Sequence, residues 1–373
     1  MKLLIDPLIF RLQKFGGISR IYAELLFNFS KQNEIAAHSF IYYTENLHLI
    51  NYNLGNTFFP FKIWRFFPFR LKNYLLEKSR IKTIEELENG KYDVFVPTYY
   101  DTTFLPFLNG TPFVLIVYDM IHELYPELEQ GSDIIHNKKQ LIERAHQIIA
   151  ISENTKQDII KCYPHISENK IQVVYLSSTL ENKELGNHFL EQLTQGKEYI
   201  LFVGNRGFYK NFTWFLKSVS SWLTKNNMLL LCLGGGVFSE TEKDLINSLN
   251  LNHLVKQYTF RDNELYFFYN RARLFVFPSD YEGFGIPVLE AMASGCPVIL
   301  PKKSSFPEVA GDAGVYYDFD DPNSLLEAIN SVCFQPELRN SFIEKGLAQS
   351  KKFSWEKTVR ACVEVFKVTA INN

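Results

Sequence analysis

Several features that would assign a protein to a common class are scarce in this sequence of 373 residues. Its five cysteines are an odd number, scattered without a Cys-x-x-Cys pair, which argues against a disulfide framework and against a zinc site. The net charge of −2 gives no indication of nucleic-acid binding. No uncharged apolar run approaches the roughly 18 residues that a membrane-spanning helix needs.

Two further patterns are absent near the amino terminus. Asp6 interrupts the first apolar residues too soon for a signal peptide, so the sequence predicts a protein of the reducing cytoplasm. No Gly-x-Gly-x-x-Gly follows the first expected strand, at residues 3–6, and this argues against a dinucleotide-dependent dehydrogenase.

The residues that are present predict an α/β protein of two domains. An apolar content of 46% is enough for two cores, and the length is typical of two domains. Short apolar runs alternate with helical patterns along the chain, as in parallel sheets covered by helices. We expect a first domain over residues 1–185, joined by part of 355–373, and a second over 196–354. A polar linker is expected near 180–197.

The most informative stretch is residues 273–300, in which a strand at 274–277 leads into a loop with two glycines. Pro287 suits the first turn of a following helix, because its missing N–H is not needed there. Loop N–H groups and the positive end of the helix dipole would together bind an anion such as a diphosphate. Glu282 in the loop and Glu290 in the helix would accept hydrogen bonds from sugar hydroxyls. The pattern suggests a nucleotide sugar, although a βαβ turn with two solvated glutamates has the same composition.

A second strand-to-helix turn carries two cations. The expected strand at 199–203 is followed by Gly204, Asn205 and Arg206, and Lys210 lies just before the next expected helix. Arg206 could bind a diphosphate as a bidentate fork and Lys210 could bind it as a point charge. The alternative is a pair of surface cations on a loop.

The amino-terminal half offers weaker signals. Gly16 and Gly17 precede an expected helix, where glycines can bring the backbone close to a ligand. A later strand runs into Tyr118, Asp119 and His122, and polar residues that follow a parallel strand lie where α/β folds place ligands. For His122 a structural, hydrogen-bonded role is the favoured interpretation.

The string Pro-Ser-x-x-Glu-Gly-Phe-Gly-x-Pro-x-x-Glu-Ala-Met-Ala-x-Gly-x-Pro-Val resembles the Glu-x7-Glu signature of retaining glycosyltransferases of family 4, which have the GT-B fold. Phe-Gly-Gly-Ile-Ser-Arg and Val-Gly-x-Arg…Lys-Asn are similar to two further elements of that family. The resemblance implies two Rossmann-like domains that face each other across a cleft, with a C-terminal helix crossing back to the first domain. It is strong over residues 199–355 and weaker before them.

The resemblance also assigns roles to individual residues. It places Glu282 near the transferred sugar, Glu290 on the donor ribose, and Arg206 and Lys210 on the donor diphosphate. Relatives usually have His-Asp where this chain has Tyr118 and Asp119, which leaves the role of Tyr118 open. The expected site residues are Glu282, Arg206, Lys210 and Asp119 for catalysis; Gly17, Gly204, Asn205, Arg206, Lys210, Gly283, Phe284, Gly285, Ile286 and Glu290 for the donor; and Gly16, Tyr118 and His122 on the acceptor side.

Together these patterns predict a retaining glycosyltransferase that moves a hexose-type sugar from a nucleoside diphosphate sugar to a glycan acceptor in surface-polysaccharide synthesis. We expect no cofactor, no metal and no nucleic acid, since protein cations would stabilise the charge on the leaving diphosphate. Two alternatives remain. A GT-B nucleotide-sugar epimerase or hydrolase would consume the donor without an acceptor, and a non-catalytic partner protein would not consume it.

Residues 57–82 are unusually rich in aromatic and basic side chains. Such a mixture is typical of segments that lie at a membrane interface, and it predicts peripheral contact with an anionic membrane through residues 58–72 and a lipid-linked acceptor. The alternative packs the aromatic rings into the core and leaves the basic groups reaching outward. The residues concerned are Phe58, Phe59, Phe61, Trp64, Phe66, Phe67 and Phe69, with Lys62, Arg65, Arg70 and Lys72.

Overall fold

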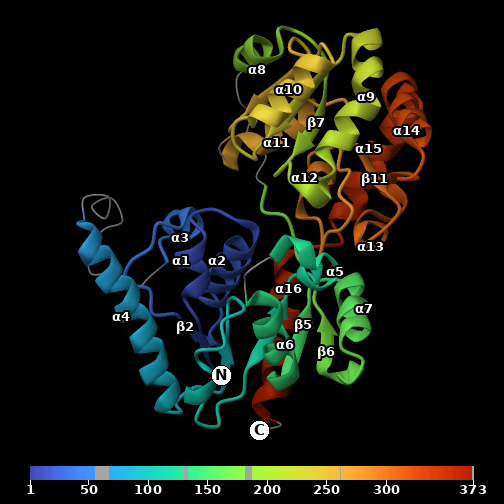
Figure 1. The fold of residues 1–373 in the computed structure, drawn as a ribbon. Coiled ribbons are helices and arrows are strands. Elements are labelled where there is room, and N and C mark those ends of the chain that lie inside the picture. Colours follow the sequence, from blue (N-terminus) through green and yellow to red (C-terminus); the bar gives the residue numbers. More distant parts are fainter. Residues whose placement is uncertain (55–66, 130–132, 181–186, 261, 372–373) are drawn as a thin grey trace. The chain divides into compact units, whose positions relative to one another are not determined.

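The chain folds into two compact units (Figure 1). Unit 1 comprises Met1–Leu176 and Trp355–Asn373, and unit 2 comprises Ser177–Ser354, so the first boundary falls before the residue 185 expected from the sequence. The computed structural model describes residues 1–54, 67–129, 133–180, 187–260 and 262–371.

Unit 1 is built around parallel strands in two three-stranded sheets, ordered β2-β1-β3 and β4-β5-β6. An isolated parallel bridge between Phe95 and Phe113 links β3 to the segment that leads into β4. β3 and β4 are buried along their whole length, as expected for strands inside a parallel sheet. The strands are β1 (Lys2–Ile5), β2 (Ala36–His38), β3 (Val94–Val96), β4 (Val114–Val117), β5 (Gln147–Ala150) and β6 (Ile171–Val173).

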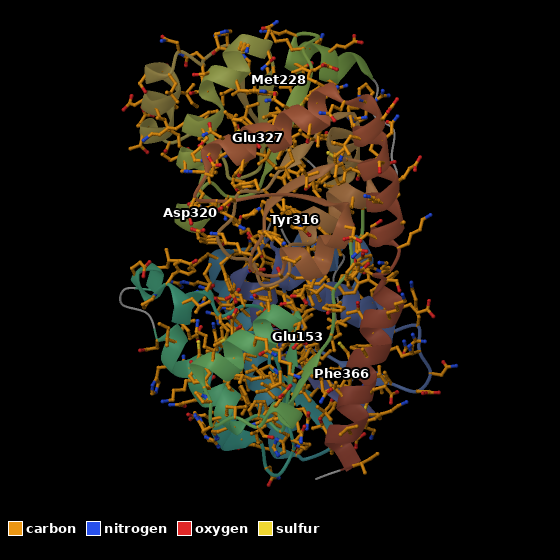
Figure 2. The ribbon with its side chains drawn as sticks, turned by 90° about the vertical axis from the view of Figure 1, so that its right-hand side faces the viewer. Glu153, Met228, Tyr316, Asp320, Glu327 and Phe366 are labelled. Atoms are coloured by element: carbon orange, nitrogen blue, oxygen red, sulfur yellow. The ribbon has the colours of Figure 1, made fainter. Side chains whose placement is uncertain are left out.

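Helices α1 to α7 connect these strands, and α16 joins them from the end of the chain. Helix α16 contacts α2 and the strands β3, β4 and β5. Phe366 lies on this helix (Figure 2). Its side chain is buried and meets Phe29 of α2 edge to face, with 6.2 Å between ring centroids. The helices are α1 (Leu8–Leu12), α2 (Gly17–Phe29), α3 (Leu47–Tyr52), α4 (Phe69–Glu88), α5 (Ile121–Leu124), α6 (Ile134–Arg144), α7 (Glu153–Cys162) and α16 (Trp355–Ile371).

Unit 2 holds one six-stranded parallel sheet of order β12-β11-β10-β7-β8-β9. Its strands are β7 (Tyr199–Val203), β8 (Leu229–Leu233), β9 (Val255–Tyr258), β10 (Phe275–Val276), β11 (Val298–Pro301) and β12 (Gly314–Tyr317). Its helices are α8 (Asn187–Thr194), α9 (Phe212–Asn226), α10 (Glu240–Ser248), α11 (Asp262–Arg271), α12 (Ile286–Ala293), α13 (Phe306–Ala310), α14 (Pro322–Phe334) and α15 (Pro336–Ser350).

The order of strands in unit 2 fixes where a ligand can bind. β7 is the first strand of the unit, and the chain adds β8 and β9 on one side of it and β10 to β12 on the other. This is the doubly wound Rossmann order, in which the connections from the two central strands leave in opposite directions. The crevice that results lies at the carboxyl ends of β7 and β10.

The α/β class expected from the sequence is confirmed, while some element bounds differ. The strand expected at residues 199–203 is observed as β7, with the same bounds. Within the expected polar linker, residues 187–194 form helix α8, because their apolar residues are spaced for one helical face.

Candidate functional site

Glycines with backbone angles that other residues rarely adopt lie in the loops that follow β7 and β10. Gly204 directly follows β7 and has a φ of 117°, and Gly285 precedes α12 with a φ of 86°. Both angles lie in the region that favours glycine. A Cβ at Gly285 would also approach Phe306 to 3.4 Å. The backbone there can therefore take a path that other residues would strain.

Helix α12 begins at Ile286, immediately after the second glycine loop. Pro287 lies at the start of the helix, where a residue without an N–H costs no helical hydrogen bond. The helix amino terminus thus lies beside the carboxyl end of β10, where its dipole favours an anion. Phe284, expected at the donor, is buried and packs edge to face on Phe353, with centroids 5.8 Å apart.

Lys210 and Glu282 form an ion pair across this crevice. The Lys210 Nζ contacts Glu282 Oε1, and the two side chains are only 12% and 15% exposed. The ammonium also lies over the rings of Tyr209 and Phe277, at 4.9 and 5.0 Å from their centroids. Burial alone would lower the pKa of Lys210, but the Glu282 carboxylate and Tyr209 raise it above its usual value. Lys210 is therefore a charged, poorly solvated cation at the proposed anion site.

Glu282 is held by two serines that sequence reasoning did not single out. Its backbone N–H donates to Ser304 Oγ at 3.0 Å, and its carbonyl accepts from Ser304 Oγ at 2.8 Å and from Ser305 Oγ at 2.9 Å. Ser304 has a φ of 55°, an unusual conformation for serine. Both serines follow β11, the strand next to β10, so their position at the carboxyl edge of the sheet is the signal that could have found them.

Glu290 lies on α12, eight residues after Glu282, and is buried. It therefore lies on the helix that begins directly after the glycine loop. The structure thus pairs Lys210 with Glu282 in the loops that follow β7 and β10, and it places Glu290 on the helix that begins after Gly285. The binding roles expected for these residues stay predictions.

Arg206 is arranged differently from the expected phosphate clamp. Its side chain is 3% exposed, and its Nε donates to Glu242 Oε1 at 2.7 Å. The two terminal nitrogens donate to backbone carbonyls of the turn after β8, at 2.9 to 3.2 Å. The guanidinium therefore braces a glycine-rich turn. The carbonyls belong to Gly234, Gly235, Gly236 and Val237.

In unit 1, Gly16 and Gly17 stand at the start of α2. Gly16 precedes the helix, and its carbonyl accepts from Ser19 Oγ at 3.0 Å. A Cβ at Gly16 would clash with the Gln13 side chain, whose Oε1 accepts from Ser19 N. A Cβ at Gly17 would meet nothing within 4 Å, so open space surrounds that position.

Tyr118, whose role the sequence resemblance left open, lies inside unit 1. Its hydroxyl donates to Tyr22 Oη at 2.6 Å and is within 3.1 Å of the Thr98 carbonyl. Burial raises the pKa of Tyr118 well above its usual range. The phenol is therefore a neutral hydrogen-bonding group of the core, and the acceptor-side role expected for it stays a prediction.

A buried lysine organises the residues that follow Tyr118. The side chain of Lys138, from α6, is 0% exposed, and its Nζ donates to Glu123 Oε2 at 2.7 Å and to the Asp119 carbonyl at 3.2 Å. His122 Nδ1 lies 3.4 Å from the same ammonium. Sequence reasoning missed this lysine, because a lysine in the middle of an amphipathic helix gives no sign that it points inward.

Among the described residues, no group of three His, Cys, Asp or Glu side chains is placed to hold a metal ion. A search of the same residues finds no helix long and apolar enough to cross a membrane.

Comparisons with known proteins find sequences that are similar to this chain. Residues 187–349 match the family described as "Glycosyl transferases group 1". The chain is 41% identical over 107 residues to the O-antigen chain mannosyltransferase B of Escherichia coli, covering 29% of this chain and 28% of that protein. It is 30% identical over 209 residues to the O-antigen chain mannosyltransferase RfbU of Salmonella typhimurium, covering 55% and 56%. The chain thus spans about half, or less, of the length of these relatives.

Solved structures extend the likeness to the whole chain. Anabaena HepE in complex with UDP and glucose superposes with a TM-score of 0.74 at 16% identity, covering 98% of both chains. WaaG, a glycosyltransferase involved in lipopolysaccharide biosynthesis, gives a TM-score of 0.66 at 14% identity, covering 98% of this chain and 99% of that one.

These findings define the fold. The fold is GT-B, with two Rossmann-like units, as the sequence predicted. Residues 187–349, within unit 2, are similar to the glycosyl transferases group 1 family, and the relatives cited above are named as mannosyltransferases.

Proposed function

We propose that the protein is a retaining glycosyltransferase of family 4 that transfers a hexose from a nucleoside diphosphate sugar to a lipid-linked glycan. The observation that carries this proposal is the largely buried Lys210–Glu282 pair, which lies just before α12 in the chain and within the residues that match the group 1 family. Breaking the donor glycosidic bond places negative charge on the diphosphate. A desolvated ammonium, the loop N–H groups and the helix dipole would stabilise that charge.

The two glutamates would each bind one of the two hydroxyl-bearing parts of the donor, the transferred sugar and the ribose. Glu282 lies at the ammonium, so it would accept from hydroxyls of the transferred sugar. Glu290 lies farther along α12 and would accept from the ribose. Because the chain supplies its own cation, we propose that transfer needs no metal and that a chelator such as EDTA leaves the rate unchanged.

The surface-polysaccharide setting rests on the relatives. A Campylobacter jejuni protein, 28% identical over 223 residues, is named as an N-acetylgalactosaminyltransferase acting on a diphospho-undecaprenol-linked sugar. That name and the O-antigen mannosyltransferases motivate a lipid-linked acceptor for this chain. We therefore propose that it works at the cytoplasmic face of a membrane.

A panel of nucleotide sugars tests the donor proposal. GDP-mannose, UDP-N-acetylgalactosamine and UDP-glucose are each scored by thermal shift and then incubated with an octyl glycoside acceptor. Binding at a hundred times the dissociation constant should raise the unfolding free energy by about 2.7 kcal/mol. NMR of the product should show the anomeric configuration of the donor. Inversion would overturn the retaining assignment, and donor consumption without an acceptor would favour the epimerase or hydrolase.

The outer face of α4 supports peripheral membrane contact. Tyr74 and Ile81 are 62% and 50% exposed, and Arg70 and Lys78 are exposed on the same helix. Lys72, in contrast, is paired with Glu45 at 2.9 Å and is a weaker candidate. Residues 58–66 of the segment predicted from the sequence lie outside the described residues.

Liposome co-sedimentation tests this membrane surface. Wild-type protein should pellet with anionic vesicles and be released by salt, because each cation near an anionic surface adds about 1 kcal/mol. An Arg70→Gln/Lys78→Gln variant should pellet less. A Lys161→Gln/Lys217→Gln variant, which removes two exposed cations elsewhere, is the charge-matched control. Equal pelleting of both variants would remove the membrane proposal and leave the transferase proposal standing.

A further inference from the structure

The loop between α1 and α2, residues 13–16, is held by a segment that lies 33 positions further along the chain and leads into α3. Asn46 Nδ2 donates to the Gln13 carbonyl at 2.7 Å, and Leu47 N donates to the Lys14 carbonyl at 2.9 Å. Two consecutive carbonyls of the loop thus have donors from outside the loop, which restricts its backbone path. Helix α3 also contacts α2, the helix that the loop precedes (Figure 1).

Asn46 makes its contact with the loop while it also caps α3. Its Oδ1 accepts from Leu49 N at 3.1 Å, and the residue is 0% exposed. Aspartate and serine are equally common helix caps. An ionised aspartate has no hydrogen to donate, however, and serine offers one oxygen for both partners. An asparagine, in contrast, accepts from the helix with one atom and donates to the loop with another.

His48 holds the second half of the loop. Its ring stacks on Phe15, with 4.9 Å between centroids and 27° between planes. His48 is buried while Phe15 is 50% exposed, so the imidazole supports a half-exposed ring from beneath. Burial lowers the pKa of His48 to about 4, with Arg20 adding to the effect and a hydrogen bond to the backbone of Gly16 opposing it. The imidazole is therefore neutral near pH 7.

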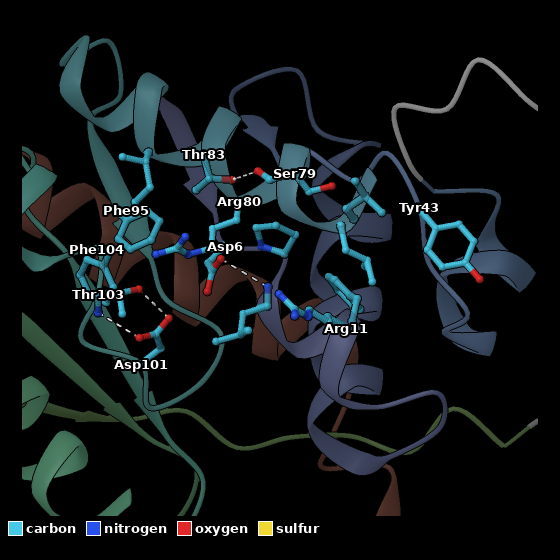
Figure 3. A pocket seen from close by; sticks show the side chains of 16 residues that line it. Asp6, Arg11, Tyr43, Ser79, Arg80, Thr83, Phe95, Asp101, Thr103 and Phe104 are labelled. Atoms are coloured by element: carbon cyan, nitrogen blue, oxygen red, sulfur yellow. Dashed lines mark hydrogen bonds between the residues drawn. The ribbon is translucent and has the colours of Figure 1, made fainter. Parts of the chain in front are cut away.

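The chain enters this holding segment beside α4. Tyr42 N donates to Ser79 Oγ of α4 at 3.1 Å, and the Tyr43 hydroxyl donates to Glu45 Oε1 at 2.6 Å. Ser79 and Tyr43 both line the hollow shown in Figure 3. Glu45 also pairs with Lys14 of the loop at 2.5 Å, but that lysine side chain is 78% exposed. Since surface pairs contribute only about 0–1 kcal/mol, the contacts of the buried residues matter more.

The loop is open on its other side. Gly17, the first residue of α2, is exposed, and a Cβ there would meet nothing within 4 Å. A Cβ at Gly16 would instead meet the Gln13 side chain at 2.4 Å. The backbone at the two glycines is thus supported from within unit 1 and accessible from outside. Functional groups are placed most accurately where a second set of residues fixes them in this way.

We propose that Asn46 and His48 are positioning residues for the transfer reaction, which fix the loop that ends at Gly16 and Gly17 without touching a substrate. They act through the loop backbone, whose place decides how Gly17 approaches the donor. This consequence rests on the proposed function, in which Gly17 belongs to the donor site. The holding of the loop rests only on contacts within unit 1.

Amide hydrogen exchange of the full chain tests whether the loop is held. The N–H groups of Ser19, Arg20 and Leu47 donate to atoms of residues 13–16, so their exchange rates report on the loop. Asn46→Ser keeps an oxygen that can cap α3 and removes the donor to the loop. We expect exchange at these three amides to rise about three- to tenfold, because one hydrogen bond is lost. Exchange at the wild-type rates would overturn the proposal.

Two histidines supply a second variant and its matched control. His48→Phe keeps a ring on Phe15 and loses the hydrogen bond to Gly16, so it should also raise exchange in the loop. His38→Phe changes an imidazole that contacts Tyr92, with ring centroids 5.6 Å apart, and should leave loop exchange unchanged. An equal rise in both variants would show general loosening of unit 1 and would overturn the specific role of His48.

Steady-state transfer kinetics separate positioning from stability. Asn46→Ser and His48→Phe should each lower kcat about tenfold, since small misplacements of a reacting group are costly. The dissociation constant for a nucleoside diphosphate should change less than about twofold, because the unit 2 groups proposed to bind it are unaltered. A residue that only stabilises the fold would leave kcat of the folded protein unchanged. Wild-type kcat in both folded variants would therefore overturn the positioning role.

The wild-type protein separates this inference from the proposed function. Absence of transfer from every nucleotide sugar of the panel would overturn the transferase and, with it, the catalytic part of this inference. Hydrogen exchange would still decide whether Asn46 and His48 hold the loop. Transfer by the wild type together with wild-type kcat in both variants would overturn this inference alone.

Discussion

The partner of the Lys210 ammonium is the Glu282 carboxylate, which under the proposed function would also contact the donor sugar. Lys210→Ala should lower turnover about 10²–10³-fold, by analogy with the loss of one oxyanion-stabilising group. Binding of a nucleoside diphosphate should weaken more than binding of the monophosphate. Steady-state kinetics and calorimetry measure both effects, with exposed Lys217→Ala as the control. Equal loss for the two nucleotides would place the ammonium away from the outer phosphate.

Two variants can distinguish whether Arg206 stabilises the turn after β8 or binds the donor diphosphate. If it braces the turn after β8, then Arg206→Lys and Glu242→Gln should each destabilise unit 2 by about 1–3 kcal/mol, because buried partners are left unsatisfied. A double-mutant cycle by urea denaturation should show strong coupling between them. If Arg206 instead acts on the diphosphate, Glu242→Gln should leave nucleotide binding unchanged while Arg206→Lys impairs it.

The raised pKa of Asp6 predicts a pH dependence of the unfolding free energy that is unusual for a carboxyl group. Its pKa is raised from 3.8 to about 7 in the folded state, mainly by burial. Between these values the folded chain holds a proton that the unfolded chain has released, so Asp6 makes the fold less stable as the pH rises toward 7 and above. The penalty disappears as the pH falls below the unfolded value.

Asp6→Asn removes this titration. Since one unit of pKa shift corresponds to about 1.4 kcal/mol, we expect the variant to gain about 1 kcal/mol or more over wild type at pH 8 and less at pH 5. Denaturation with urea across this range measures the difference. Asp93→Asn, at an exposed backbone contact of Lys2, is the comparison. A difference that stays constant with pH would show that Asp6 does not titrate in this window.

At the scale of elements, the segment after β4 depends on one buried ammonium from α6. Lys138→Met would leave the Glu123 carboxylate buried without its cation, a change that typically costs about 3–5 kcal/mol. Urea denaturation should show this loss, and a second change, Glu123→Gln, should restore part of it. Lys139→Met, at an exposed neighbouring position, should be close to neutral. A neutral Lys138→Met would show that Glu123 finds another donor.

The elements also show what local sequence can and cannot predict. The run 199–203 and Gly285, which precedes α12, were predictable, because a buried strand and a positive φ angle restrict the residue types at these positions. The bracing of Arg206 was not predictable, since its partners lie 28 to 36 positions away and only the fold brings them together. For the same reason the sequence did not show that the Lys138 side chain is buried.

At the scale of the whole molecule, α16 stabilises a unit from which it is separated by all of unit 2. It buries Val359, Cys362, Val363 and Phe366 in unit 1. Each such side chain contributes about 1.5–3 kcal/mol, so their sum is comparable with the roughly 5–15 kcal/mol that stabilises a typical domain. A variant that ends at Ser354 should therefore unfold in unit 1 and remain folded in unit 2.

Limited proteolysis with mass spectrometry measures this outcome. Fragments should come from residues 1–176, and the nucleotide-sugar thermal shift of unit 2 should persist. A variant ending at Ile371, which keeps α16, should resist cleavage. A protease-resistant unit 1 in the shorter variant would show that α16 is dispensable.

The same arrangement has a consequence for how such genes can diversify. Because unit 2 is one uninterrupted stretch of coding sequence nested inside unit 1, two recombination events, near codons 176 and 354, would exchange it whole. Under the proposed function, the hybrid would draw on a different activated sugar while serving the same recipient. Under the same proposal, exchange of this one stretch would change the linkage that is formed and leave the acceptor-binding unit unaltered.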